Sequence, residues 1–288
     1  MRFLLAMAAA LTVVAGTTRA GEVRIVAAEN FYGGIAQAIG GNDVEVTSIL
    51  SNPNQDPHEF TTSASTAKAV ADADIVIYSG IDYDPWVDKL LGTGGKPDRT
   101  VICVASLIGA KPGDNPHIWY DPRTMPTLAD KLVTVLTQRN PAKQFFYQVN
   151  AGEFKKAMDP VLVNIARLRA SFQGTAVTAT EPVFGYMADA LGLKMLNYDF
   201  QVKIMNDTEP GAAETAAFEQ SLRSKTAKML FYNSQVTDPT TERLKGIARD
   251  SGIPVIGVTE TQPPEYKSYT DWMQAELKAV EKGMKGAD

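Results

Sequence analysis

The segment that decides the fold is Ala71-Asp-Ala-Asp-Ile-Val-Ile-Tyr78. Its second half, residues 75–78, is a short apolar run bounded by polar residues, which is typical of a strand buried on both faces. Residues 64–71, directly before it, are predicted to form a helix. A helix that leads into a short buried strand is the repeating unit of an α/β fold with a parallel sheet.

The same alternation of helix and strand extends from this segment in both directions along the chain. It predicts an α/β fold with mostly parallel sheets that are covered by helices. We predict strands at residues 23–28, 44–50, 75–78, 100–104, 176–179, 229–232 and 254–258. We predict helices at residues 31–39, 64–71, 86–91, 122–139, 183–190, 211–222, 239–250 and 269–284.

The middle of the chain breaks this pattern, because residues 141–171 contain no strand-like run. Pro141 suits the first turn of a long helix, and Pro160 predicts a kink or a break within it. A mature chain of about 268 residues is also long for one core, so two domains are expected. We predict an N-terminal αβ lobe (21–140), a connecting helix (141–172) and a C-terminal αβ lobe (173–288). A site is expected in the cleft between the lobes.

Residues 1–20 are predicted to be a signal peptide. Arg2 provides a positive start, and the apolar run 3–15 is too short to span a bilayer. Thr18-Arg19-Ala20 ends in a small residue that signal peptidase accepts. We therefore expect a periplasmic protein, cleaved near Ala20 and not inserted in the membrane.

The charge and the cysteine content exclude several classes of protein. Loss of Arg2 and Arg19 leaves 26 Lys and Arg against 33 Asp and Glu, a net charge of −7. A mildly acidic chain without a basic cluster excludes a nucleic-acid partner. Cys103 is the only cysteine, so no intramolecular disulfide can form. It lies in an apolar run, where a small core residue is expected in place of a ligand or nucleophile.

The chain contains only two histidines, and the sequences around them are similar. His58 follows Pro57 and His117 follows Pro116, each in a loop after a predicted strand. Imidazole is the commonest metal ligand in proteins because its neutral form offers a directed lone pair. A lone histidine is more often structural, so the residues alone leave a structural and a metal-binding role equally open.

Three motifs together resemble the metal-specific solute-binding proteins of ABC importers, the zinc, manganese and iron periplasmic binding proteins. They are Asp56-Pro57-His58, the segment 71–78 and Pro116-His117-Ile118-Trp119-Tyr120-Asp121-Pro122. The resemblance covers the mature chain. It implies a non-enzymatic carrier, acting as a monomer, that gives one divalent transition metal ion to an ABC-transporter membrane permease.

The resemblance also implies four metal ligands between the lobes, two from each. The first pair matches His58 and His117. The third matches Glu181, at a position where zinc-selective members carry His and manganese or iron members carry Glu. The fourth matches Glu260, although the family usually has Asp there. Asp199, Asp207 and Glu209 are competing acids in a polar stretch that is expected to be a solvated surface.

Two imidazoles and two carboxylates form a mixed, oxygen-rich ligand set. If the carboxylates bind through both oxygens, five or six donors result, which favours Mn²⁺ or Fe²⁺. Zinc remains an alternative, because Zn²⁺ binds most nitrogen and oxygen sites more tightly than Mn²⁺ does. The segment Thr259-Glu260-Thr261 is also similar to a branch of the family associated with zinc import.

A metallohydrolase is the alternative from a different class of function. Such a site keeps a metal position open for water and needs a base nearby, a role that Glu59 could fill. However, the sequence has no His-Glu-x-x-His pair and no third histidine for proton transfer.

Overall fold

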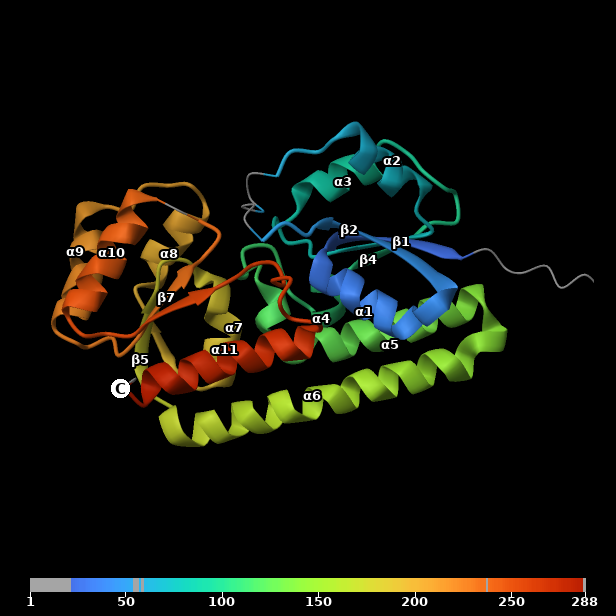
Figure 1. Cartoon of the computed structure of the whole chain (residues 1–288). Helices are drawn as coiled ribbons and strands as arrows, with labels where there is room; N and C mark the ends of the chain where they lie inside the picture. Colours follow the sequence, from blue (N-terminus) through green and yellow to red (C-terminus); the bar gives the residue numbers. More distant parts are fainter. Residues whose placement is uncertain (1–21, 54–56, 58–59, 237, 287–288) are drawn as a thin grey trace, which may run out of the picture.

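The computed structural model describes residues 22–53, 57, 60–236 and 238–286. Within them the first half of the chain forms a sheet of parallel strands in the spatial order β2-β1-β3-β4 (Figure 1). Ile25 of β1 lies between Val46 and Ile75 of the neighbouring strands. The strands are β1 (Val23–Glu29), β2 (Val44–Leu50), β3 (Ile75–Tyr78) and β4 (Thr100–Cys103).

Helices cover both faces of this sheet, as Figure 1 shows. Alternate strand residues point to opposite faces, so Val26 and Val76 pack with Val87, whereas Ile25 and Ile77 belong to the core on the other face. The helices are α1 (Asn30–Gly40), α2 (Ala64–Asp72), α3 (Pro85–Leu91), α4 (Val104–Ile108) and α5 (Thr124–Arg139).

The long helix α6 (Gln144–Phe172) leads to a second sheet with the same strand order, β6-β5-β7-β8, again parallel. Its 29 residues correspond to about 43 Å, and it runs beneath both sheets in Figure 1. The strands are β5 (Ala176–Ala179), β6 (Lys194–Leu196), β7 (Leu230–Asn233) and β8 (Val255–Val258). The helices are α7 (Gly185–Ala190), α8 (Tyr198–Met205), α9 (Ala212–Arg223), α10 (Pro239–Asp250) and α11 (Tyr269–Met284).

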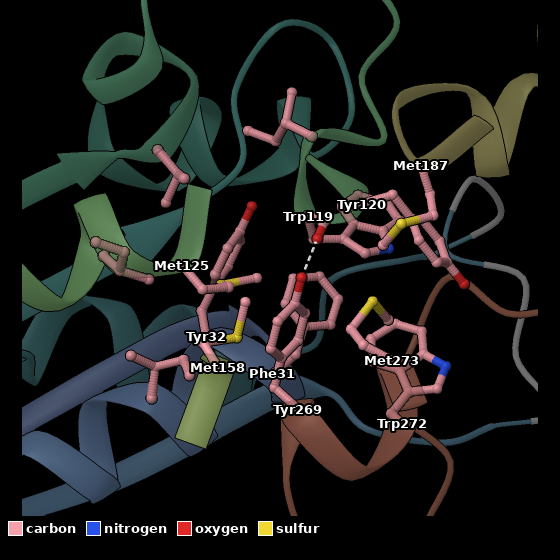
Figure 2. Packing of buried hydrophobic residues seen from close by; sticks show 14 of the residues in the cluster. Phe31, Tyr32, Trp119, Tyr120, Met125, Met158, Met187, Tyr269, Trp272 and Met273 are labelled. Atoms are coloured by element: carbon pink, nitrogen blue, oxygen red, sulfur yellow. Dashed lines mark hydrogen bonds between the residues drawn. The ribbon is translucent and has the colours of Figure 1, made fainter. Parts of the chain in front are cut away.

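One hydrophobic core joins the two halves of the molecule. It contains Ile77 of the first sheet and Phe231 of the second, and it continues through the buried faces of α1, α5, α6 and α11. Figure 2 shows Trp272 and Tyr269 of α11 packed beside Phe31 of α1. The Tyr269 hydroxyl donates a 2.6 Å hydrogen bond to the carbonyl oxygen of Trp119. The last helix of the chain therefore packs against the first half.

The structure confirms the predicted α/β class with two parallel sheets and a long helix between them. Of the predicted kink or break at Pro160, the break is wrong, because α6 continues through it, and the kink stays a prediction. Met158 and Val161 on either side are buried in the core, and this packing offsets the hydrogen bond that proline cannot make. The lobe boundaries at 140 and 172 stay a prediction. Within the described residues, no helix combines the length and apolarity needed to cross a membrane.

Candidate metal centre

Both sheets place polar side chains just beyond the carboxyl ends of their strands. In each sheet the strand order reverses between its two central strands, β1 and β3 in one and β5 and β7 in the other. Ligands of open α/β sheets bind beside such reversal points, at the carboxyl ends of the strands. Glu181 follows β5, Asn233 ends β7 and Glu260 follows β8. His117, from the first half of the chain, lies beside Glu260. The distance from His117 Nε2 to Glu260 Oε2 is 3.5 Å.

His117 is fully buried, and its tautomer follows from its neighbour Asn115. The Asn115 Nδ2 donates to the carbonyl oxygen of Pro182 at 2.7 Å, which turns its Oδ1 toward the imidazole. This oxygen lies 2.7 Å from His117 Nδ1, and because an amide oxygen only accepts, Nδ1 carries the hydrogen. In its neutral form His117 therefore presents the lone pair of Nε2 toward Glu260, the arrangement that a metal-binding histidine needs.

The two carboxylates of the second half share one amide. Glu181 and Glu260 are both buried. The Asn233 Nδ2 donates to Glu181 Oε2 at 3.3 Å and also to Glu260 Oε1. Gln235 fixes the backbone beside Glu260, since its Oε1 accepts from the amide nitrogens of Glu260 at 2.6 Å and of Thr261 at 3.0 Å.

Tyr83 adds a hydroxyl group from the first half of the molecule. Its ring packs edge-on against His117, with 5.9 Å between the ring centroids. Burial raises the pKa of the Tyr83 hydroxyl well above its usual value, and the nearby charge of Glu260 raises it further. The hydroxyl therefore stays protonated at neutral pH and can donate a hydrogen bond to Glu260.

A second pair of buried acids lies at the carboxyl end of β1. Burial raises the pKa of Glu29 well above its usual value, and the negative charge of Asp84 adds to the effect. Asp84 instead accepts hydrogen bonds from the amide nitrogens of Ser79 at 2.7 Å and Gly80 at 2.8 Å. Glu29 is therefore the protonated member of the pair, and the pair fixes the loop that carries Tyr83.

The two halves are tied together around this site by hydrogen bonds. The Tyr120 hydroxyl donates to the carbonyl oxygen of Thr259 at 2.9 Å. The Tyr186 hydroxyl donates to the carbonyl oxygen of Asn115 at 2.9 Å. The loops carrying His117, Glu181 and Glu260 are consequently held against one another.

Three of the four predicted ligands come together in the structure: His117 lies beside Glu260, and Asn233 joins Glu260 to Glu181. The fourth predicted ligand, His58, lies outside the described residues, as does Glu59. Among the described residues, no three His, Cys, Asp or Glu side chains are spaced to hold a metal ion. The competing acids Asp199, Asp207 and Glu209 are exposed, in contrast to the buried site.

Comparison with known proteins identifies the family of the chain. The family described as the periplasmic zinc-uptake complex component A, ZnuA, matches residues 25–283. The chain belongs to this family. Its members are metal-binding substrate-binding proteins of ABC importers and not enzymes, so the metallohydrolase alternative is not supported.

Individual relatives differ in the metal that their names give. The manganese ABC transporter substrate-binding lipoprotein PsaA of Streptococcus pneumoniae is 23% identical, covering 93% of this chain and 91% of its own. The zinc-binding protein AdcA of Streptococcus pyogenes is 20% identical, covering 90% of this chain and 56% of its own.

Solved structures share the fold. The periplasmic zinc-binding protein TroA from Treponema pallidum superposes with a TM-score of 0.78 at 15% identity, covering 92% of this chain and 99% of its own. A manganese-bound periplasmic metal-binding protein from Candidatus Liberibacter asiaticus gives a TM-score of 0.75 at 22% identity, covering 91% and 100%.

The sequence did not reveal Asn233, Gln235 or Tyr83 as parts of the site. The predicted strand ended at residue 232, whereas β7 ends at Asn233. The available signal was therefore positional: a polar residue at the carboxyl end of a central parallel strand.

Proposed function

We propose that this chain binds one divalent transition metal ion between its lobes and delivers it to the membrane permease of an ABC importer. The proposed ligands are His58, His117, Glu181 and Glu260. The observation that carries the proposal is the 3.5 Å approach of His117 Nε2 to Glu260 Oε2, two fully buried groups from opposite halves of the chain.

The chemistry of these side chains suits a divalent cation as cargo. In its neutral form His117 offers a lone pair, and in their ionised forms Glu181 and Glu260 would bring two negative charges into a buried region. Two such charges are costly to bury unless a cation neutralises them. One divalent ion balances them and gains ligands of both nitrogen and oxygen type.

The residue types admit more than one metal. Glu181 in place of histidine favours Mn²⁺ or Fe²⁺ if the carboxylates use both oxygens. Zn²⁺ is the second candidate, because the hydrogen bonds of Asn233 already engage one oxygen of each carboxylate. The names of the relatives include both manganese and zinc carriers.

Delivery would take place outside the cytoplasmic membrane. Residues 1–20 would direct export to the periplasm, with cleavage near Ala20, and the mature chain would meet the permease there as a monomer. The shared core and the hydrogen bonds between the halves favour small movements of loops over a wide hinge opening during release.

Ligand variants test this proposal. His117→Ala and Glu181→Ala should each weaken Zn²⁺ and Mn²⁺ binding to the chelator-treated protein by more than about 100-fold, beyond the effect of changing a supporting residue. Glu265→Ala, at an exposed acid of the neighbouring loop, is the matched control and should leave affinity unchanged. Isothermal titration with chelator competition measures the affinities.

A thermal melt of each variant checks that the fold persists. A metal present at a thousandfold excess over Kd should stabilise the folded wild type by about 4 kcal/mol. Tight retention of one ion per chain by the double variant His58→Ala, His117→Ala would contradict the ligand assignment.

A further inference from the structure

Asn233 occupies a fixed position between the two carboxylates of the site. It is buried at the last position of β7. Its Oδ1 accepts a 3.0 Å hydrogen bond from the backbone nitrogen of Gln235. This bond determines the orientation of the amide, because a flipped side chain would direct two donors against each other. The Nδ2 group, with its two hydrogens, must therefore face Glu181 and Glu260.

Each carboxylate uses one particular oxygen for this amide. Glu181 accepts through Oε2 at 3.3 Å, and Glu260 accepts through Oε1. The other oxygen of Glu260, Oε2, is the atom that lies 3.5 Å from His117 Nε2. The amide thus determines which oxygen of Glu260 faces the imidazole, and it engages one oxygen of each carboxylate in a hydrogen bond.

Gln235 holds the backbone at Glu260 in place. Its Oε1 accepts from the backbone nitrogens of Glu260 and Thr261, and its Nε2 donates to the Thr261 hydroxyl at 3.0 Å. Asn233 ends β7 and Gln235 lies in the turn that follows, so nearby residues fix both the carboxylate and the backbone of Glu260. Because both side chains are neutral, they orient the carboxylates without competing with a cation for their charge.

We infer that Asn233 is a specificity-determining positioning residue that keeps Glu181 and Glu260 as one-oxygen ligands. Two such carboxylates, together with His117 and the proposed ligand His58, would give four donors, the number that Zn²⁺ favours, whereas Mn²⁺ favours more oxygen donors. The inference rests on the proposed metal-capture function. It moves the preferred cargo from Mn²⁺ or Fe²⁺, which the residue types alone favour, toward Zn²⁺.

The test compares wild type with Asn233→Leu, which keeps the branched shape of the side chain but removes both donors and the Oδ1 acceptor. Zn²⁺ and Mn²⁺ dissociation constants are measured by chelator competition, and donor numbers by X-ray absorption of each loaded form. We expect the ratio of Zn²⁺ to Mn²⁺ affinity to fall roughly 10-fold or more in the variant, the usual scale for a residue that supports a ligand. The Mn²⁺-loaded variant should also gain oxygen donors relative to wild type.

Asn164→Leu is the matched control, because Asn164 donates through its amide to Gln274 on α11, away from the site. It should leave the affinity ratio and the donor numbers unchanged. If Asn233→Leu weakened the binding of Zn²⁺ and Mn²⁺ equally and left the donor numbers unchanged, Asn233 would have only a structural role.

The wild type supplies a test that does not depend on the folding of a variant. Its Zn²⁺-loaded form should show four nitrogen and oxygen donors, and six donors would overturn the inference. Failure of wild type to bind either metal would instead overturn the proposed function itself, so the two failures are distinguishable.

Discussion

Two asparagine side chains orient the ionisable groups of the candidate centre. Asn115 sets the tautomer of His117 through a 2.7 Å contact with Nδ1, and Asn233 bridges Glu181 and Glu260. Both amides are themselves fixed by backbone groups, of Pro182 and of the turn after β7. Neutral donors and acceptors can fix such groups permanently, whereas a lysine or arginine would offset part of the negative charge that attracts a cation.

The sequence predicted His117, Glu181 and Glu260 as candidate ligands because each belongs to a short motif. The structure places His117 beside Glu260. The role of Asn233 could not be predicted in the same way. Its contacts join residues separated by 52 and 27 positions, and they depend on how β7 lies between β5 and β8. His58 lies outside the described residues, so its role stays a prediction.

Glu276 should make the stability of the metal-free protein depend on pH. Burial raises the pKa of Glu276 to about 7, whereas the unfolded chain has the ordinary value near 4.5. Between these values the unfolded state releases its proton first, so the free energy of unfolding falls as pH rises. The total fall from this group is about 3 kcal/mol, complete above pH 7 and absent below the unfolded pKa.

Glu276→Gln should remove this fall while still accepting the 3.1 Å hydrogen bond from Trp272 Nε1. Urea denaturation should therefore show a higher free energy of unfolding for Glu276→Gln than for wild type at pH 8, and no difference at pH 4. Glu281→Gln, on the same helix, is the control. Ion pairs with Arg167 and Lys285 lower the pKa of Glu281 to about 2, so its replacement should not stabilise the protein at pH 8. If Glu276→Gln and wild type had the same free energy of unfolding at pH 8, the account would be contradicted.

At the element scale, α11 links the end of the chain to its beginning. Trp272 is fully buried and contacts Phe31 of α1 and Tyr120, with ring centroids 5.9 and 5.6 Å apart. The helix begins where Ser268 accepts a hydrogen bond from the backbone nitrogen of Asp271, which satisfies one amide of its first turn. The same helix also packs along α6.

Removal of this contact should destabilise the whole molecule. Trp272→Ala leaves a cavity where the two halves meet, and we expect the free energy of unfolding to fall by about 3–5 kcal/mol. Trp272→Phe, which keeps most of the apolar contact, should lose clearly less. Urea denaturation at constant pH gives both values. A loss below about 1 kcal/mol in the alanine variant would show that the contact contributes little.

Element prediction succeeded where strands are short, continuous and apolar, as at Ile75–Tyr78. It failed at β6 and α8, for which the sequence pattern predicts neither a strand nor a helix. The strand β6 has three residues, and α8 buries only Phe200 and Gln201, so neither shows a usable hydrophobic period. Tertiary packing, and not local preference, stabilises these elements.

At the scale of the whole molecule, the two sheets have the same strand order and a common core. Two half-sites thus face each other, one with His117 and Tyr83 and the other with Glu181, Asn233 and Glu260. The repetition was not visible in the sequence, because topology can recur without similarity of side chains. The α/β class and the long helix were predictable, since both follow from hydrophobic pattern and length.

The metal content of the protein purified from its native compartment tests the central claim most directly. The measurement is mass spectrometry of the metal in each preparation, in buffers without chelator, for wild type and for His117→Ala. We predict one divalent transition metal ion per wild-type chain and a small fraction of that in the variant. Wild-type protein without stoichiometric metal, or a His117→Ala variant that retains one ion per chain, would contradict the account.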